Sequence, residues 1–127
     1  MSPALVLWAA LGSGLGAGLR WTLSLLMAGA GHGLPWATLA VNALGALVAG
    51  FYMGRHGPGS ARPHRVAAQV FMLPGLCAGF TTFSIFSLEA VHHFAGHGAG
   101  AAFGLVLASV ATWLVAVALG DWLGRRF

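Results

Sequence analysis

The sequence contains no lysine, and its only acidic side chains are Glu89 and Asp121. It offers no paired carboxylates for acid–base chemistry, no Ser-His-Asp set, no Walker loop and no supported pair of haem ligands. Cys77 is the single cysteine, which excludes a disulfide framework and a thiolate metal site. These absences predict a protein that is not an enzyme.

Charge of either sign is scarce. Charged residues make up 6% of the chain and hydrophobic residues 58%, whereas an ordinary soluble domain is about 25% charged. This composition predicts a multi-pass membrane protein, and we expect it in the plasma or inner membrane. The arginines lie at the ends of apolar segments, where positive charge sets membrane orientation. We therefore expect the lipid bilayer as a partner and no nucleic acid, and we expect no cleavable signal peptide.

What the sequence does contain is long apolar segments. Residues 4–29, 36–54, 66–91 and 99–123 each have the length and composition of a membrane-spanning helix. They predict an all-α membrane protein in which residues 1–127 form a single domain of four transmembrane helices. Four short helices enclose little volume, so an oligomer is the natural inference.

Polar groups inside the first two spans are few. In the first span, Arg20 either faces a cavity or partner or extends its side chain to the membrane surface, and the sequence leaves both open. In the second span, Thr38 and Asn42 are four residues apart and share one helix face. An asparagine at mid-membrane must find partners. Asn42 is therefore either an interhelical hydrogen-bonding group or a ligand donor.

The third span has an unusual middle, residues 75–87, in which two glycines, four hydroxyl residues and three phenylalanines lie together. Pro74 precedes this stretch and removes a helical donor. Non-helical backbone at membrane depth persists only where protein or a cavity shields it. The stretch therefore predicts a helix broken near its middle. Glu89 follows it, near the predicted exit from the membrane, where an ordinary interfacial carboxylate is the simple interpretation.

The glycine-rich segment after the third span contains His92, His93 and His97. The spacing of His93 and His97 would suit a shared metal on a helix face, but the glycines around them predict a turn. No carboxylate or cysteine completes a ligand set there, so we do not expect a metal at this place.

The polar groups at membrane depth are mostly neutral donors: Asn42, Thr38, Ser84, Ser87, Ser109 and Thr112. A cation path would need carboxylates or rings of carbonyls, so neutral donors favour an anion path. The rings of Phe83 and Phe86 are positive at their edges and could stabilise an anion weakly. Packing is the alternative role for both rings.

The segment 79–87, GFTTFSIFS, resembles the signature of the Fluc (CrcB) fluoride channels. The segment 38–42, TLAVN, with Gly45 and Gly50 is similar to the second-helix motif of that family. Gly12, Gly16 and Arg20-Trp21 are similar to its first-helix pattern. The resemblance covers all four spans in order and implies passive, selective conduction of fluoride.

The resemblance also implies an assembly: two antiparallel copies in a dual-topology dimer with two separate fluoride pores. Asn42 would be the pore donor, Phe83 and Phe86 the aromatic pore residues, and Ser84 and Thr38 part of the polar path. A structural sodium ion would be held by the backbone carbonyls of Ala78 and Thr81.

In the fourth span the resemblance implies a pore hydroxyl at Ser109, or at Thr112 if the register shifts. Leu105 and Trp113, one turn to either side of Ser109, fall where other family members can have polar residues.

Two alternatives stay open beside the channel. A small multidrug-type exporter also has four short helices in an antiparallel pair, but it needs an acidic residue deep in the first span, which this chain lacks. A membrane scaffold without transport would show the same glycine-rich packing, but it would not need Asn42 or the hydroxyl run at mid-depth.

Charge and resemblance disagree on orientation. Arg55, Arg62, Arg65, Arg125 and Arg126 all fall on one predicted side of the membrane, which favours a single orientation with the termini inside. An antiparallel homodimer needs both orientations from one sequence. We favour the homodimer, because all pore motifs are present in this chain. A heterodimer with an oppositely oriented partner is the alternative.

Overall fold

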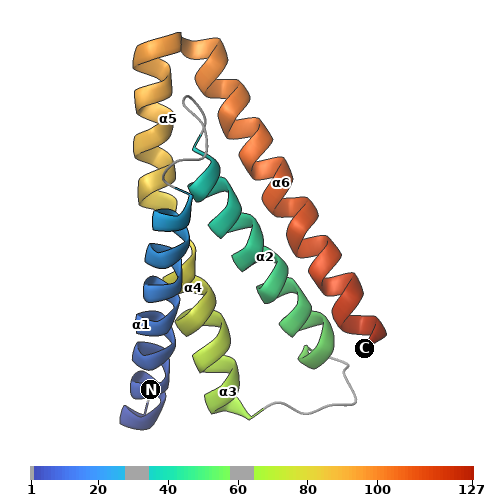
Figure 1. The fold of residues 1–127 in the computed structure, drawn as a ribbon. Coiled ribbons are helices and arrows are strands. Elements are labelled where there is room, and N and C mark those ends of the chain that lie inside the picture. The colour runs from blue at the N-terminus through green and yellow to red at the C-terminus, as the bar shows by residue number, and fades with distance from the viewer. Residues whose placement is uncertain (1, 28–34, 58–64) are drawn as a thin grey trace.

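The computed structural model describes residues 2–27, 35–57 and 65–127, which form helices that run up and down side by side (Figure 1). The first two spans are α1 (Pro3–Leu26) and α2 (Trp36–His56). The third is made of α3 (Val66–Val70), the π-helical segment η1 (Phe71–Cys77), α4 (Ala78–Phe80) and α5 (Phe83–His97). The fourth is α6 (Ala99–Arg126).

Four stretches of the described chain are long and apolar enough to cross a membrane: Pro3–Leu26, Trp36–His56, Val66–His97 and Ala99–Arg126. The predicted all-α fold with four membrane helices is confirmed, and so is the break within the third. Both chain ends lie at the same end of the bundle, as four spans require (Figure 1). An ion pair also lies there, since Arg125 Nε is 2.7 Å from Asp121 Oδ2.

The third and fourth helices extend beyond their predicted ends. The prediction that His92, His93 and His97 lie in a turn is wrong, because α5 continues to His97 and includes Gly96. An interior glycine costs a helix only about 1 kcal/mol, which a long apolar helix tolerates. Gly98 ends α5, since its φ of 84° lies in the region that favours glycine. At the other end of the chain, residues 28–29 of the predicted first span lie outside the described residues.

Glycines fix the packing of α2 on α6. A Cβ on Gly50 would meet the carbonyl oxygen of Val117, and one on Gly54 would meet that of Asp121. The contact is reciprocal, because a Cβ on Gly120 would meet the carbonyl oxygen of Leu47. Small residues spaced four apart let helix backbones touch in lipid, where packing rather than the hydrophobic effect holds helices together.

A second set of glycines packs α1 against the first half of the third span. A Cβ on Gly12 would meet Phe71 O, and one on Gly16 would meet Leu76 O. Gly12 and Gly16 thus form a helix–helix contact within this chain. A Cβ on Gly14 or Gly18, by contrast, would meet nothing within 4 Å.

The third span changes its winding before it breaks. Pro74 lies inside η1, where the wider π-helical turn accommodates a residue that cannot donate a hydrogen bond. The break itself is confined to Thr81 and Thr82, which have extended backbone with ψ of 161° and 121°. The predicted stretch 75–87 was therefore too broad, and helical structure resumes at Phe83.

We predict that Gly16→Ala lowers the thermal stability of the protein in detergent. Its methyl group would meet the Leu76 carbonyl oxygen and, at 2.7 Å, the Phe80 nitrogen. Both are backbone atoms that cannot move aside, and overpacking of this kind costs about 1–3 kcal/mol. Gly14→Ala is the matched control, with open space around the added methyl group. Equal melting temperatures for the two variants would contradict the prediction.

Candidate functional site

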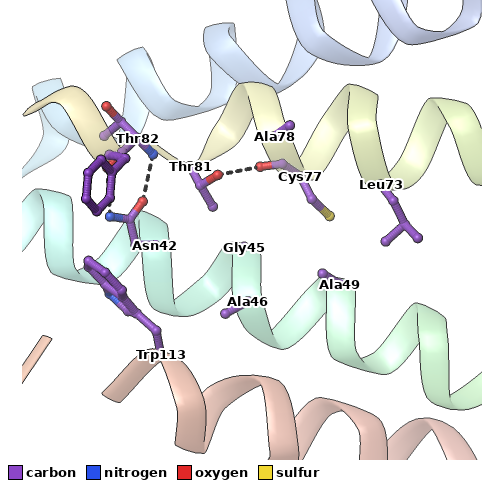
Figure 2. A pocket seen from close by; sticks show the side chains of 11 residues that line it. Asn42, Gly45, Ala46, Ala49, Leu73, Cys77, Ala78, Thr81, Thr82 and Trp113 are labelled. Atoms are coloured by element: carbon purple, nitrogen blue, oxygen red, sulfur yellow. Dashed lines mark hydrogen bonds between the residues drawn. The ribbon is translucent and has the colours of Figure 1, made fainter. Parts of the chain in front are cut away.

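The break in the third span is held by a side chain from α2. Asn42 Nδ2 donates to the Thr82 carbonyl oxygen at 2.9 Å, and the Thr82 N–H donates to Asn42 Oδ1 at 2.7 Å (Figure 2). Asn42 is buried, with 6% of its surface exposed. The sequence predicted that Asn42 needs a hydrogen-bond partner. That partner is the backbone of Thr82, 40 residues away in the sequence, at the break of another helix.

This pairing changes the bonding of the neighbouring carbonyls. In a continuous helix the Thr82 N–H would donate to Ala78 O, but here it donates to Asn42. The Ile85 N–H would donate to Thr81 O, but it donates instead to Thr82 Oγ1 at 3.3 Å. Ala78 and Thr81 therefore both lose their helical donors, and both line a cavity beside the break.

Glu89 has a hydrogen-bond partner on another helix. Thr38 Oγ1 donates to Glu89 Oε1 at 2.7 Å, and Thr38 itself is buried. The other carboxylate oxygen, Glu89 Oε2, is also buried and has no hydrogen-bond partner among the described residues. Because α5 continues to His97, beyond the predicted end of the span at Val91, Glu89 lies in the middle of the helix rather than near its end.

The two phenylalanines of the motif lie close together but in different surroundings. Their ring centroids are 5.7 Å apart. Phe86 is buried, and its ring lies nearly perpendicular to that of Trp113 at 4.8 Å. Phe83 is 72% exposed on the surface of the single chain. Phe83 can therefore serve a path only if something covers that surface.

The predicted hydroxyl residues also divide into buried and exposed ones. Ser109 is buried on α6, with 2% of its surface exposed. Thr112 is exposed, and its hydroxyl donates to the Ala108 carbonyl of its own helix at 2.7 Å. Of the two candidates in the fourth span, Ser109 is thus the one inside the bundle. Ser84 is exposed at the start of α5, with its Oγ 3.4 Å from Thr82 Oγ1.

Arg20 reaches towards the break from α1. Its Nε donates to the Gly79 carbonyl oxygen at 3.4 Å, and the contact is partly buried. Of the two interpretations left open by the sequence, the structure therefore gives Arg20 a protein partner.

A cavity of about 410 Å³ opens beside the break. Asn42, whose amide points to Thr82, and Trp113 line one end of it, and Ala78, Thr81 and Thr82 come from the third span (Figure 2). Most of the remaining lining is apolar: Gly45, Ala46, Ala49, Leu73, Cys77 and Phe83. A second cavity, of about 350 Å³, is lined in part by Trp36, His93 and Ser109.

Two contributors to this site were not assigned from the sequence. Thr82 acts through its backbone, which no side-chain pattern reveals. Trp113 lies one helical turn after Ser109, and this spacing was the available signal, because residues four apart share a helix face.

Together, the fold and the site define a small four-span membrane protein with a broken third helix and mostly uncharged polar groups beside the break. This is the construction of an ion path rather than of an active centre. The sequence model described as "CrcB-like protein, Camphor Resistance (CrcB)" matches residues 7–121. The chain belongs to the CrcB family, which is not a family of enzymes.

Curated relatives share most of their length with this chain. A protein of Bradyrhizobium diazoefficiens named "Fluoride-specific ion channel FluC 1" is 39% identical over 126 residues, which cover 99% of this chain and 88% of the relative. A Chelativorans protein named "Fluoride-specific ion channel FluC" is 41% identical over 119 residues, covering 91% of each. The protein of that name in Rhodospirillum rubrum is 38% identical and covers 94% of this chain and 90% of itself. These relatives do not support the exporter or scaffold alternatives.

We predict that Asn42→Ala speeds hydrogen exchange at the Thr82 amide. The substitution removes the acceptor Oδ1, and a backbone group left unpaired costs about 1–3 kcal/mol. Exchange would therefore accelerate about 10-fold or more, since 1.4 kcal/mol corresponds to a factor of ten. Asn42→Asp is the control, because it keeps an oxygen for that N–H. An unchanged rate in the alanine variant would show that Asn42 does not hold the break.

Proposed function

We propose that the protein is a fluoride-selective channel through which fluoride leaves the cell passively. The observation that carries the proposal is the burial of three uncharged polar side chains inside the bundle: Thr38, Asn42 and Ser109. A small anion loses its water on entering such a path and must be compensated by N–H and O–H groups. Neutral groups do this without holding the ion as tightly as an arginine would, and weak binding at several places permits conduction.

Four of the predicted residues have a role in this path. An asparagine amide has two hydrogens, and only one is used on Thr82, so Asn42 has a second to offer an anion. The ring edges of Phe83 and Phe86 supply weaker positive charge beside it. Ser84 lies at the exposed start of α5, where its hydroxyl extends the polar groups of the break. The names of the relatives supply fluoride as the ion.

The active form in this proposal is an antiparallel dimer of two copies in the plasma or inner membrane. Phe83 is 72% exposed in the single chain, and the cavity beside the break is lined mainly by apolar residues. A second copy would cover both. The arginine bias still favours one orientation, so a heterodimer with an oppositely oriented partner is the competing assembly.

A structural sodium ion fits the break in this proposal. The carbonyls of Ala78 and Thr81 have lost their helical donors, and both residues line the open cavity. Carbonyl oxygens suit hard cations. One chain supplies two such groups, so a second copy would double the set. The ion would hold the two breaks together without being transported.

We predict that liposomes containing only this purified chain release fluoride when a potassium ionophore balances the charge. Asn42→Asp should abolish the release, because it places a negative charge on the path of an anion. Phe83→Ile should slow it while preserving bulk. Normal size-exclusion profiles for both variants serve as the control for assembly.

Liposomes loaded with chloride test selectivity in the same assay. Equal release of chloride would overturn fluoride selectivity. Release of neither ion would overturn the channel function for the chain acting alone and leave the heterodimer as the remaining assembly. Equal signals from C-terminal reporters on the two sides of the membrane would match the antiparallel homodimer.

We also predict that sodium stabilises the assembled protein. Replacing sodium by a large organic cation should lower the melting temperature, because a ligand present at 100 times its dissociation constant contributes about 2.7 kcal/mol. Potassium at equal ionic strength is the control. A dimer whose melting temperature and flux are the same in all three media would contradict the sodium site.

A further inference from the structure

The last turns of α5 carry a pair of histidines that has no role in the proposed channel. His93 and His97 are four residues apart, so they share one face of the helix. Their rings lie side by side, with centroids 4.5 Å apart and an interplanar angle of 29°. We expected no metal here because the neighbouring glycines predicted a turn, but α5 continues as a helix to His97. The structure thus provides the helix face that a shared ligand needs.

The ring nitrogens of the pair are available. Among the described residues, neither ring has a hydrogen-bond partner. A neutral imidazole has one nitrogen with a free lone pair, so the pair offers two such nitrogens. Two bonds of about 2.0–2.1 Å to a tetrahedral ion leave the nitrogens about 3.3 Å apart. Adjacent, nearly parallel rings can reach that separation by rotation about their side-chain bonds, with the backbone unchanged.

The surroundings of the pair also suit a cation. The junction of α5 and α6 lies at the end of the bundle opposite both chain ends (Figure 1). The described arginines are elsewhere, at the break or at the end of α2, the start of α3 and the end of α6: Arg20, Arg55, Arg65, Arg125 and Arg126. No described arginine would therefore repel a cation here. His97 is exposed and His93 is half-buried, so an ion can reach both from water.

We propose that His93 and His97 bind a divalent transition-metal ion of the zinc and copper class. Imidazole nitrogen suits these ions, whereas magnesium and calcium prefer oxygen ligands. The described residues provide no third histidine, cysteine or carboxylate to complete a ligand set. Glu89, one turn before His93, has its Oε1 bonded to Thr38 instead. Water completes the coordination in this proposal, so the ion is exchangeable. The inference does not depend on the channel function.

Copper(II) is the first probe, because it binds nitrogen sites most tightly among the divalent first-row metals and its paramagnetic resonance spectrum reports nitrogen ligands. In protein purified without a polyhistidine tag, we expect a bound copper whose spectrum shows coupling to ring nitrogens. His93→Gln and His97→Ala should each weaken that binding about tenfold or more, since each removes one of the two protein ligands.

Two further variants serve as controls for the other histidines of the chain. His92→Ala changes an exposed neighbour on a different face of α5 and should leave the copper site unchanged. The double variant His93→Gln/His97→Ala retains His32, His56, His64 and His92, so it measures the copper that these four bind.

Hydrogen exchange tests the site with a second metal. The Gly98 N–H donates to the Phe94 carbonyl oxygen at 2.9 Å, within the turn that a bound ion would bridge. Zinc at 100 times its dissociation constant should slow exchange of this amide by up to about 100-fold, because the ion stabilises the closed turn. Magnesium at the same concentration is the control and should have no effect.

A nitrogen-coupled copper signal that the double variant lacks, together with zinc protection of Gly98, supports the inference. Copper bound equally well by the double variant, or a Gly98 amide that exchanges at the same rate with and without saturating zinc, overturns it. Fluoride release plays no part in either measurement, so failure of the proposed channel function leaves this test intact.

Discussion

The structure depends on one constraint: in a membrane, a broken helix must have its exposed backbone groups satisfied from within the protein. The third span breaks at Thr81 and Thr82, and Asn42 bonds both the N–H and the C=O of Thr82. These two hydrogen bonds make a break possible at a depth where water is absent. They use the Asn42 oxygen and one of its two amide hydrogens. The second hydrogen remains as a donor for an ion, so that one residue can both stabilise the fold and bind.

That interaction is possible only because the helices approach closely. Gly50 and Gly120 bring the backbones of α2 and α6 into contact, and Gly12 and Gly16 do the same for α1 and the third span. Gly45 lies three residues after Asn42 on α2, and a Cβ there would meet the Thr81 side chain. Gly45 thus lets α2 come close enough to the break for the short Asn42 side chain to reach Thr82.

Much of this could be predicted from the sequence. The lengths of the apolar runs gave four helices, and Pro74 with the hydroxyl-rich stretch indicated a broken third one. The need of Asn42 for partners followed from its depth. Its actual partner did not, because a backbone group has no sequence signature and the register between helices depends on their packing. The end of the third span was misplaced for a simpler reason: glycines after Val91 suggested a helix end that lies at His97.

Trp113 illustrates a different limit. An aromatic residue at helical spacing usually packs, and nothing in the sequence says whether its N–H is satisfied. Only the three-dimensional arrangement shows that its N–H is buried and has no hydrogen-bond partner among the described residues.

The break also sets two helix ends of opposite polarity side by side. The helical run that ends at Phe80 presents carbonyls, and α5, which begins at Phe83, presents amide hydrogens. Each end of a helix carries roughly half an elementary charge from its aligned peptide dipoles, negative at the carboxyl end and positive at the amino end. Near the middle of the span the backbone therefore offers one pole that attracts cations and another that attracts anions. Both arise from uncharged peptide groups, so neither depends on the protonation of a side chain.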